Sequence, residues 1–257
     1  MAQETSSETQ QQHALIRGEF KKQAAGWGQR SDDLSEAAQL LALESGFTVL
    51  DVATGSALFA SAIAPKVKRV IASDITPEML AQAQKRGIDN IQPLLAAAES
   101  LPHAANTFDR VVTRYSLHHI QDPRAIVKEM YRVCRRQGAV MIIDIVAPED
   151  EDVAKRYNQL ERLRDPSHRA ALGFSALREM MAEVGFKIAG SKVNPHGEMD
   201  LAGWFDLAQT GADERKQVTE ALEKEIHNGR ETGFHPTYRD GALKIVHTVG
   251  TVMGVKR

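Results

Sequence analysis

Short apolar runs alternate with helical segments along most of this chain, and this alternation constrains its fold more than any other feature. Between residues 45 and 195 the runs are apolar on both faces, as in strands that are covered on both sides of a sheet. Runs occur at 47–53, 69–75, 91–98, 108–116, 139–147 and 186–194, and a last one spans 242–256. Strands separated by helices in this way predict an α/β fold with a doubly wound, Rossmann-like sheet of seven strands.

Helical periodicity also appears outside the alternating region. Helices are expected before it at 13–28 and 32–45, and a helix at 123–136 should carry basic residues in its last turn. Residues 1–12 are polar and predicted to be disordered. We therefore expect residues 1–45 to form an N-terminal tail and lid helices. Residues 46–257 should form one α/β domain with helical additions at about 149–185 and 200–230, the second just before the last strand.

Bulk composition excludes several classes of function. The net charge of −2 gives no basic surface for nucleic acid. A single cysteine, Cys134, rules out an internal disulfide, and the nine histidines show no HExxH spacing, so no metal site is expected. No apolar run reaches the ~18–20 residues of a membrane span, and the first residues lack a signal peptide's basic start and apolar core. We expect a cytoplasmic protein that acts on a small molecule.

The stretch VLDVATGSALFASAIA, residues 49–64, contains the clearest candidate binding loop. It joins an apolar strand ending at Asp51 to an Ala-rich helix through a turn at Gly55, with Ala53 and Ala57 on either side. The next strand ends at Asp74, where a carboxylate can accept hydrogen bonds from a ribose diol. The helix after the turn offers free N–H groups at its N-terminus. These features predict a nucleoside site at the carboxyl edge of the sheet.

Later motifs narrow the prediction. The segment AAAESLPHAANTFDRVVTRYSLHHIQDPRAIVKEMYRVCRRQGAVMIIDI, with Asp51 and Asp74–TPEML before it, resembles class I S-adenosylmethionine-dependent methyltransferases. It is most similar to the branch that includes the ubiquinone and menaquinone C-methyltransferases, the methyltransferase type 11 group. The segment ERLRDPSHRAALGFSALREMMAEVGF resembles the tail of the same bacterial subgroup. The resemblance covers roughly Phe20 to the C-terminus and implies the class I methyltransferase fold.

The resemblance also implies a cofactor, S-adenosylmethionine, and residues that contact it. The residues expected to bind the cofactor are Trp27, Asp51, Ala53, Gly55, Ser56, Asp74, Ile75, Ala98, Glu99 and Arg114. Two positions depart from the family pattern, since Ala57 replaces the third loop glycine and Ala97 replaces an acid that binds the adenine amino group. Each lost hydrogen bond would weaken binding by ~0.5–1.5 kcal/mol, and the methyl group of Ala57 costs little if the backbone there is helical.

Histidines supply the candidate catalytic groups, because imidazole titrates near neutral pH. His118 and His119 follow the fourth strand, and in extended backbone only one of them should reach the pocket. His168 belongs to the segment RDPSH, residues 164–168, which could form a turn followed by a helix cap at Ser167 or could line the acceptor pocket, because it follows the fifth strand. Arg114 lies at the end of the fourth strand and could orient an anionic substrate. Asp144, on the fifth strand, is expected to be structural.

The leading interpretation is methyl transfer to carbon or oxygen of a small, hydrophobic or aromatic molecule, by an enzyme that could form a homodimer. One alternative is an enzyme of the same fold that performs non-methylating chemistry, as a cyclase or a lyase; Ala57 and Ala97 motivate it. A second alternative is a non-catalytic binding module. Measuring whether S-adenosylmethionine binds, and whether its methyl group is then transferred, distinguishes these three interpretations.

Overall fold

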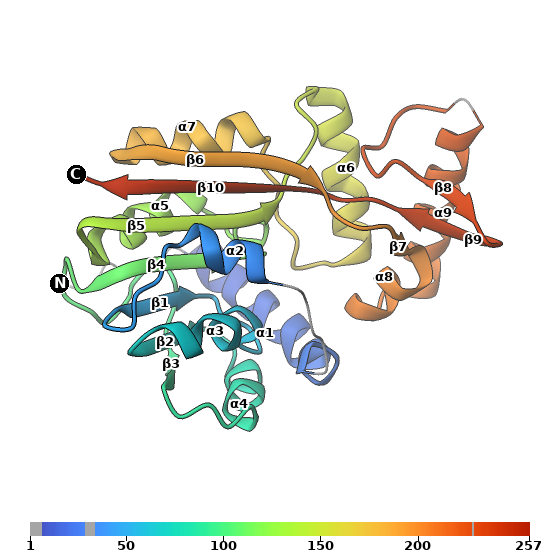
Figure 1. Ribbon diagram of the computed structural model, residues 1–257. Helices are drawn as coiled ribbons and strands as arrows, with labels where there is room; N and C mark the ends of the chain where they lie inside the picture. The colour runs from blue at the N-terminus through green and yellow to red at the C-terminus, as the bar shows by residue number, and fades with distance from the viewer. Residues whose placement is uncertain (1–6, 29–33, 228) are drawn as a thin grey trace.

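A mixed α/β sheet forms the centre of the protein (Figure 1). The computed structural model describes residues 7–28, 34–227 and 229–257, so the predictions made for residues 1–6 and 29–33 lie outside it. Within the described residues one sheet has seven strands in the order β3-β2-β1-β4-β5-β10-β6. Strand β10 runs antiparallel to both of its neighbours, and the other pairs are parallel. The predicted doubly wound, seven-stranded fold is confirmed.

The strands of this sheet are β1 (Thr48–Val52), β2 (Arg69–Asp74), β3 (Ile91–Leu95), β4 (Phe108–Arg114), β5 (Cys134–Ile145), β6 (Phe186–Pro195) and β10 (Thr248–Lys256). The helices are α1 (Ser7–Gly28), α2 (Ser35–Leu40), α3 (Leu58–Ile63), α4 (Pro77–Lys85), α5 (Pro123–Val133), α6 (Glu151–Arg164), α7 (Phe174–Val184), α8 (Leu201–Ala208) and α9 (Ala212–Ile226). Short 3₁₀ turns occupy Ala64–Lys66 and Leu117–His119.

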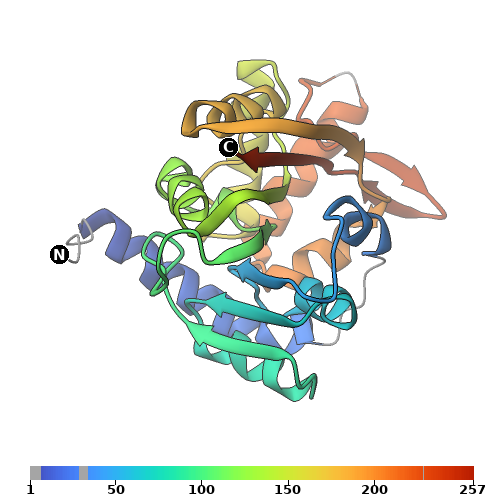
Figure 2. The same cartoon turned by 60° about the vertical axis from the view of Figure 1, so that its left-hand side comes forward.

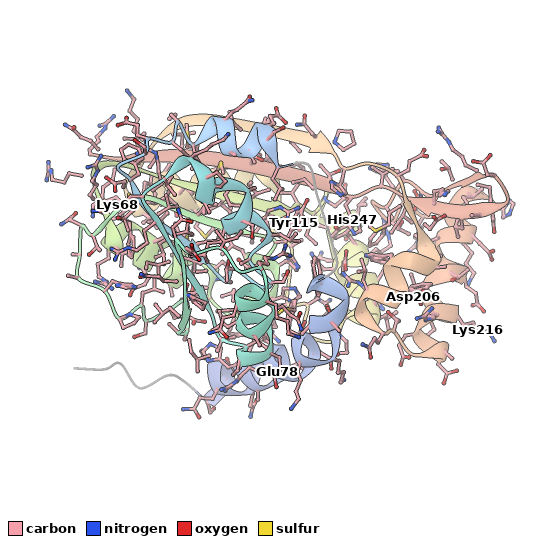
Figure 3. All side chains as sticks on the ribbon, turned by 60° about the horizontal axis from the view of Figure 1, so that its bottom comes forward. Lys68, Glu78, Tyr115, Asp206, Lys216 and His247 are labelled. Carbon is pink, nitrogen blue, oxygen red and sulfur yellow. The ribbon has the colours of Figure 1, made fainter. Side chains whose placement is uncertain are left out.

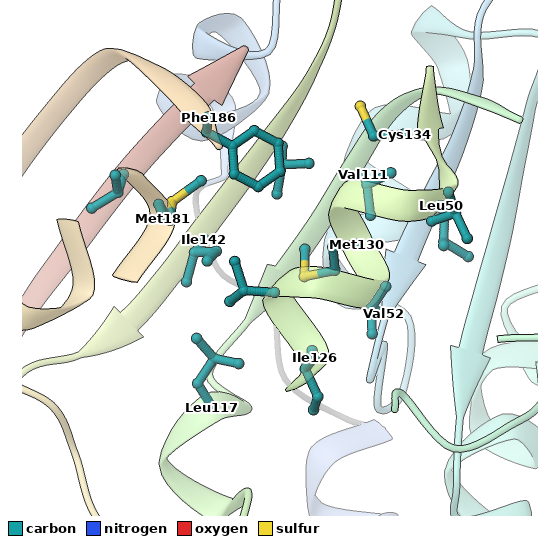
Figure 4. Packing of buried hydrophobic residues seen from close by; sticks show 14 of the residues in the cluster. Leu50, Val52, Val111, Leu117, Ile126, Met130, Cys134, Ile142, Met181 and Phe186 are labelled. Atoms are coloured by element: carbon teal, nitrogen blue, oxygen red, sulfur yellow. The ribbon is translucent and has the colours of Figure 1, made fainter. Parts of the chain in front are cut away.

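Apolar side chains cover both faces of the sheet, as the apolar runs predicted. On one face Leu50, Val111 and Ile142 pack against α5 and α7, a cluster shown in Figure 4. On the other face Val49 and Val112 pack against α2 and α3. Because both faces are buried, function is confined to the edges of the sheet, where the strands end.

Local sequence signals account for several helix ends. Helices α4 and α5 begin with a proline in the first turn, where the missing N–H has no helical partner to lose. The Asp122 carboxylate caps α5 by accepting from the N–H of Ala125 at 3.1 Å. Gly185 ends α7 in a left-handed conformation.

Three predicted helix boundaries are wrong. The chain is helical from Ser7, so disorder over residues 7–12 is not found, and of the helix expected at 32–45 the described part spans only Ser35–Leu40. Helix α5 stops at Val133 rather than 136, because the chain enters β5 at Cys134. The Lys256 ammonium donates to the carbonyl of Tyr131 at 2.7 Å and so binds the end of α5 from a distant strand.

The last predicted strand is divided in two. Residues Ala242–Ile245 form β9, which joins β7 (Met199–Asp200) and β8 (Thr237–Arg239) in a small three-stranded sheet, and β10 begins at Thr248. With α6, α8 and α9 this sheet encloses a separate apolar core containing Tyr157, Trp204 and Phe234. We call this unit the C-terminal module. It lies beyond the end of β5, on the right of Figure 1.

Helix α1 also lies outside the main sheet. It contacts both α4 and α8 of the C-terminal module, and in Figure 2 it runs from the N-terminus behind the strands. None of the helices in the described part of the chain has the length and apolar character required to cross a membrane.

Candidate active site

One cavity lies at the carboxyl edge of the sheet and brings together most of the predicted site residues. Trp27, Asp51, Ala53, Gly55, Ser56 and Asp74 all line it. Ile75, Ala98, Glu99, Arg114, His118 and His119 line it as well. The C-terminal module closes its far end with Arg164, Trp204 and His247. Figure 3 labels His247 and Tyr115, another lining residue, near the middle of the view.

The turn after β1 has an unusual backbone. Ala53, Gly55 and Ala57 adopt positive φ angles of 53°, 56° and 60°. Side chains rarely take this left-handed conformation, which costs roughly 1–2 kcal/mol for a residue with a Cβ. The methyl group of Ala57 was expected to cost little if the backbone there is helical. Ala57 instead lies in the left-handed region, just before α3, so this condition is not met. All three residues thus have a conformation suited to glycine, but only Gly55 is a glycine.

Two buried carboxylates hold this turn. Asp74 accepts hydrogen bonds from the N–H groups of Gly55 and Thr76, both at 2.8 Å. Asp51 accepts from the hydroxyl of Thr54 at 2.7 Å. Burial raises the pKa of Asp51 to about 7, against the lowering effect of the Thr54 hydrogen bond, and burial also raises the pKa of Asp74.

His118 is hydrogen-bonded to Asp144, the acid on β5 that was expected to be structural. Its Nδ1 lies 2.5 Å from Oδ1 of Asp144, whose other oxygen accepts from the N–H of Leu117 at 2.7 Å. Burial alone would lower the pKa of His118, but the charge and hydrogen bond of Asp144 outweigh it and the pKa is raised. Asp144 thus holds a proton on His118, and Nε2 is the ring nitrogen left for the cavity.

His119 is bonded through a serine to a second acid. The Ser167 hydroxyl donates to Oδ1 of Asp165 at 2.6 Å and also lies 3.0 Å from Nδ1 of His119. Because the Ser167 hydroxyl donates its proton to Asp165, Nδ1 of His119 must donate to the Ser167 oxygen. Nε2 of His119 then carries the lone pair. Burial, followed by the neighbouring charge of His118, lowers the pKa of His119 to about 4.

Both histidines reach the cavity, contrary to the prediction that only one would. They lie in the 3₁₀ turn Leu117–His119 rather than in extended backbone, and their ring centroids are 4.1 Å apart. From α1, the ring of Phe20 meets that of His119 edge-on at 5.0 Å, and the Gln12 amide donates to the carbonyl oxygens of His119 and Ser167 at 2.7 and 2.8 Å.

His168 is not among the residues that line the cavity. Its Nε2 lies 2.7 Å from Oδ1 of Asn158, and burial lowers its pKa to about 3. The predicted helix cap at Ser167 is wrong, because the next helix begins only at Phe174 and Ser167 instead bonds to Asp165 and His119.

Sequence reasoning missed Gln12, Trp204 and His247 as site residues. Gln12 lies in the segment expected to be disordered, and His247 lies in the middle of a predicted strand. No local motif identifies them, because their partners are remote in sequence: His247 bonds to Glu161, 86 residues away. In the described part of the chain, no group of three His, Cys, Asp or Glu side chains is placed to hold a metal ion.

Comparison with known proteins identifies the family. Residues 50–142 match a methyltransferase domain model. The uncharacterised methyltransferase YcgJ of Bacillus subtilis is 31% identical over 216 residues, which are 81% of this chain and 84% of YcgJ. The chain belongs to the class I S-adenosylmethionine-dependent methyltransferases. The crystal structure of YcgJ has a TM-score of 0.77 to this methyltransferase, at 29% identity, and the match covers 87% of this chain and 97% of the other.

A ubiquinone/menaquinone biosynthesis C-methyltransferase, UbiE of Rickettsia prowazekii, is 36% identical to this methyltransferase over 107 residues. That match covers only 37% of this chain and 43% of UbiE, and it agrees with the resemblance found in the sequence.

The cofactor of this methyltransferase is S-adenosylmethionine, and the residues of the cavity are suited to it. Gly55 leaves open space where a Cβ would stand, so backbone can approach a ligand there. Asp74 offers a buried carboxylate at the end of β2, and Ile75 and Met79 line the cavity beside it. Ala97, which replaces the family's acid, is not among the lining residues, but the Glu99 carboxylate is.

Proposed function

We propose that this methyltransferase methylates carbon or oxygen of a small hydrophobic or aromatic acceptor, with His119 as general base. One arrangement supports this most strongly: two adjacent histidines line one cavity, and Asp144 is hydrogen-bonded to His118 and raises its pKa, whereas His119 is hydrogen-bonded to Ser167 and burial lowers its pKa. The cofactor, when bound, supplies an electrophilic methyl group. His119 accepts the acceptor's proton at Nε2, and protonated His118 donates a hydrogen bond from Nε2 to the oxygen on which charge develops.

The same proposal assigns the other end of the cavity to the cofactor. Asp74 binds the ribose hydroxyls, and the Ala98 backbone with the Glu99 carboxylate meets the adenine. Asp51 and Arg114 lie near each other, since the charge of Arg114 lowers the pKa of Asp51, and they face the methionine part. Trp27, half-buried in α1, covers the mouth.

Calorimetry followed by a transfer assay tests the proposal. S-adenosylmethionine and S-adenosylhomocysteine are titrated first, and methyl-labelled cofactor is then incubated with a panel of phenols, hydroxyquinones and β-dicarbonyl compounds. We expect both ligands to bind and label to appear in a neutral hydroxylated acceptor. Binding without transfer to any acceptor would favour the non-methylating alternative, and absence of heat at millimolar ligand would refute the cofactor assignment.

The histidine pair gives this proposal a specific pH profile. His119 must be neutral, so kcat/KM should rise as pH increases through about 4. His118 must be protonated, so kcat/KM should fall only above 6.5, the ordinary pKa of histidine. His119→Gln should lower kcat by ~10²–10⁴-fold and remove the rising limb, with S-adenosylhomocysteine affinity retained. His168→Gln, in the same cluster but off the cavity, is the control and should keep both limbs.

A further inference from the structure

The far end of the cavity carries a histidine whose role the proposed function leaves open. His247 lies in the connection between β9 and β10, is 5% exposed and lines the cavity. Aromatic rings surround it: its ring centroid lies 5.5 Å from those of Trp204 and Phe234 and 6.2 Å from that of Tyr157. Packing of this kind fixes the plane of the imidazole, so its ring nitrogens point in defined directions.

A buried acid fixes the tautomer of this ring. Nε2 of His247 lies 2.8 Å from Oε1 of Glu161, which is fully buried. Burial would raise the pKa of Glu161, but Arg164 and His247 hold it well below its usual range. Glu161 is therefore an acceptor, and in the neutral form of the His247 imidazole the proton is on Nε2. Nδ1 then presents a lone pair, for which the described residues provide no hydrogen-bond donor.

The charges around His247 disfavour an anionic acceptor molecule. The Arg164 guanidinium is 3.2 Å from Oε2 of Glu161 and 3.6 Å from Oδ2 of Asp165, so two carboxylates already balance it. Asp144 adds a third carboxylate behind protonated His118. With His118 protonated and His247 neutral, these three carboxylates face two positive charges, and an incoming carboxylate or phosphate would meet repulsion in a poorly solvated site.

We propose that His247 is a positioning residue that accepts, at Nδ1, a hydrogen bond from an uncharged hydroxyl or N–H group of the acceptor remote from the methylated atom. The inference rests on the proposed function, because it assumes that the acceptor occupies the end of the cavity next to His118 and His119. It adds a requirement to the acceptor: a neutral hydrogen-bond donor at its far end and no anionic group there.

Three matched probes test the inference on protein saturated with S-adenosylhomocysteine: 2-naphthol, 2,6-dihydroxynaphthalene and 6-hydroxy-2-naphthoate. They share a ring and one hydroxyl and differ only in hydrogen, hydroxyl or carboxylate at the opposite position. After division by two for the diol's two equivalent orientations, calorimetry should show the diol binding ~2–10-fold more tightly than 2-naphthol, the worth of one neutral hydrogen bond. The naphthoate should bind more weakly than 2-naphthol.

The variant His247→Phe keeps an aromatic ring in the packed site and removes the nitrogen. It should abolish the advantage of the diol and leave 2-naphthol and S-adenosylhomocysteine binding unchanged. His227→Phe, at an exposed position after α9, is the matched control and should keep the advantage. Equal binding of diol and naphthol to the wild type, a preference for the naphthoate, or a preference for the diol that survives in His247→Phe would overturn the inference.

Nuclear magnetic resonance of ¹⁵N-histidine-labelled wild-type protein provides a readout that does not depend on the variant. His247 should show a protonated Nε2, and the diol should shift the resonance of Nδ1. A protonated Nδ1, or no shift with the diol bound, would overturn the inference. Absence of S-adenosylhomocysteine binding refutes the proposed function, whereas cofactor binding without any probe refutes only the acceptor requirement.

Discussion

The protonation state of Asp51 should make the affinity for the positively charged cofactor depend on pH. Burial raises its pKa to about 7, so near neutral pH a fraction of the molecules carries the acid in its protonated form. In the proposed site a positive sulfonium lies beside Asp51 and favours its carboxylate form, which predominates only above that pH. If the carboxylate form alone binds well, affinity for S-adenosylmethionine should rise about tenfold from pH 6 to pH 8, as expected for one proton.

S-adenosylhomocysteine is the matched control for this prediction, because its thioether is neutral and its affinity should change much less with pH. Isothermal titration at pH 6, 7 and 8 measures both ligands. The pH dependence for S-adenosylmethionine should vanish in Asp51→Asn. An equal pH dependence for the two ligands would contradict the proposed position of Asp51 beside the sulfonium.

The alanines around Gly55 give a second prediction at this scale. Ala53 and Ala57 both have positive φ, but Ala53 is half-buried whereas Ala57 is 0% exposed. Ala53→Gly should relieve strain and raise the free energy of unfolding by about 1 kcal/mol. Ala57→Gly relieves similar strain but loses a buried methyl group worth ~0.8 kcal/mol, so its net effect should be near zero. Urea unfolding measures both, and equal stabilisation by the two variants would contradict this account.

At the scale of elements, Gln12 hydrogen-bonds α1 to the turn that carries the proposed base. The Gln12 amide bonds to the carbonyl oxygens of His119 and Ser167, two residues that hold the proposed base. Gln12→Leu leaves both buried carbonyls without this donor, at a cost of ~1–3 kcal/mol. Amide hydrogen exchange in residues 7–28 should become faster, and cofactor affinity should fall. Gln11→Leu, at an exposed neighbouring position, is the control and should change neither.

Helices and strands were predictable where local sequence signals determine where they begin and end. The alternating apolar runs predicted every strand of the main sheet, and Pro77 and Gly185 mark helix ends that the structure contains. Local sequence signals failed where a contact with a residue remote in sequence determines the structure. Helix α5 ends early at a site that Lys256 binds, and His118 and His119 share the cavity because the turn that carries them is 3₁₀. The role of Asp144 depends on a partner 26 residues away, which periodicity does not reveal.

At the scale of the whole molecule, the cavity is built by two units. The turn after β1 and the end of β2 form the end assigned to the cofactor, and the C-terminal module forms the end assigned to the acceptor. The two tryptophans of the chain divide between these ends. Trp27 is half-buried in α1, and its carbonyl accepts from the Ser56 hydroxyl at 3.1 Å. Trp204 is 2% exposed in the core of the module.

Each tryptophan can therefore report on one end of the cavity. In Trp204→Phe the emission comes from Trp27, and acrylamide should quench it in the free protein and less when S-adenosylhomocysteine is bound. In Trp27→Phe the emission comes from Trp204, whose burial should keep quenching weak with or without ligand. Stern–Volmer constants from both variants make the comparison. Protection of Trp204 rather than Trp27 would mean that the cofactor occupies the end assigned here to the acceptor, because a ligand shields the tryptophan it covers.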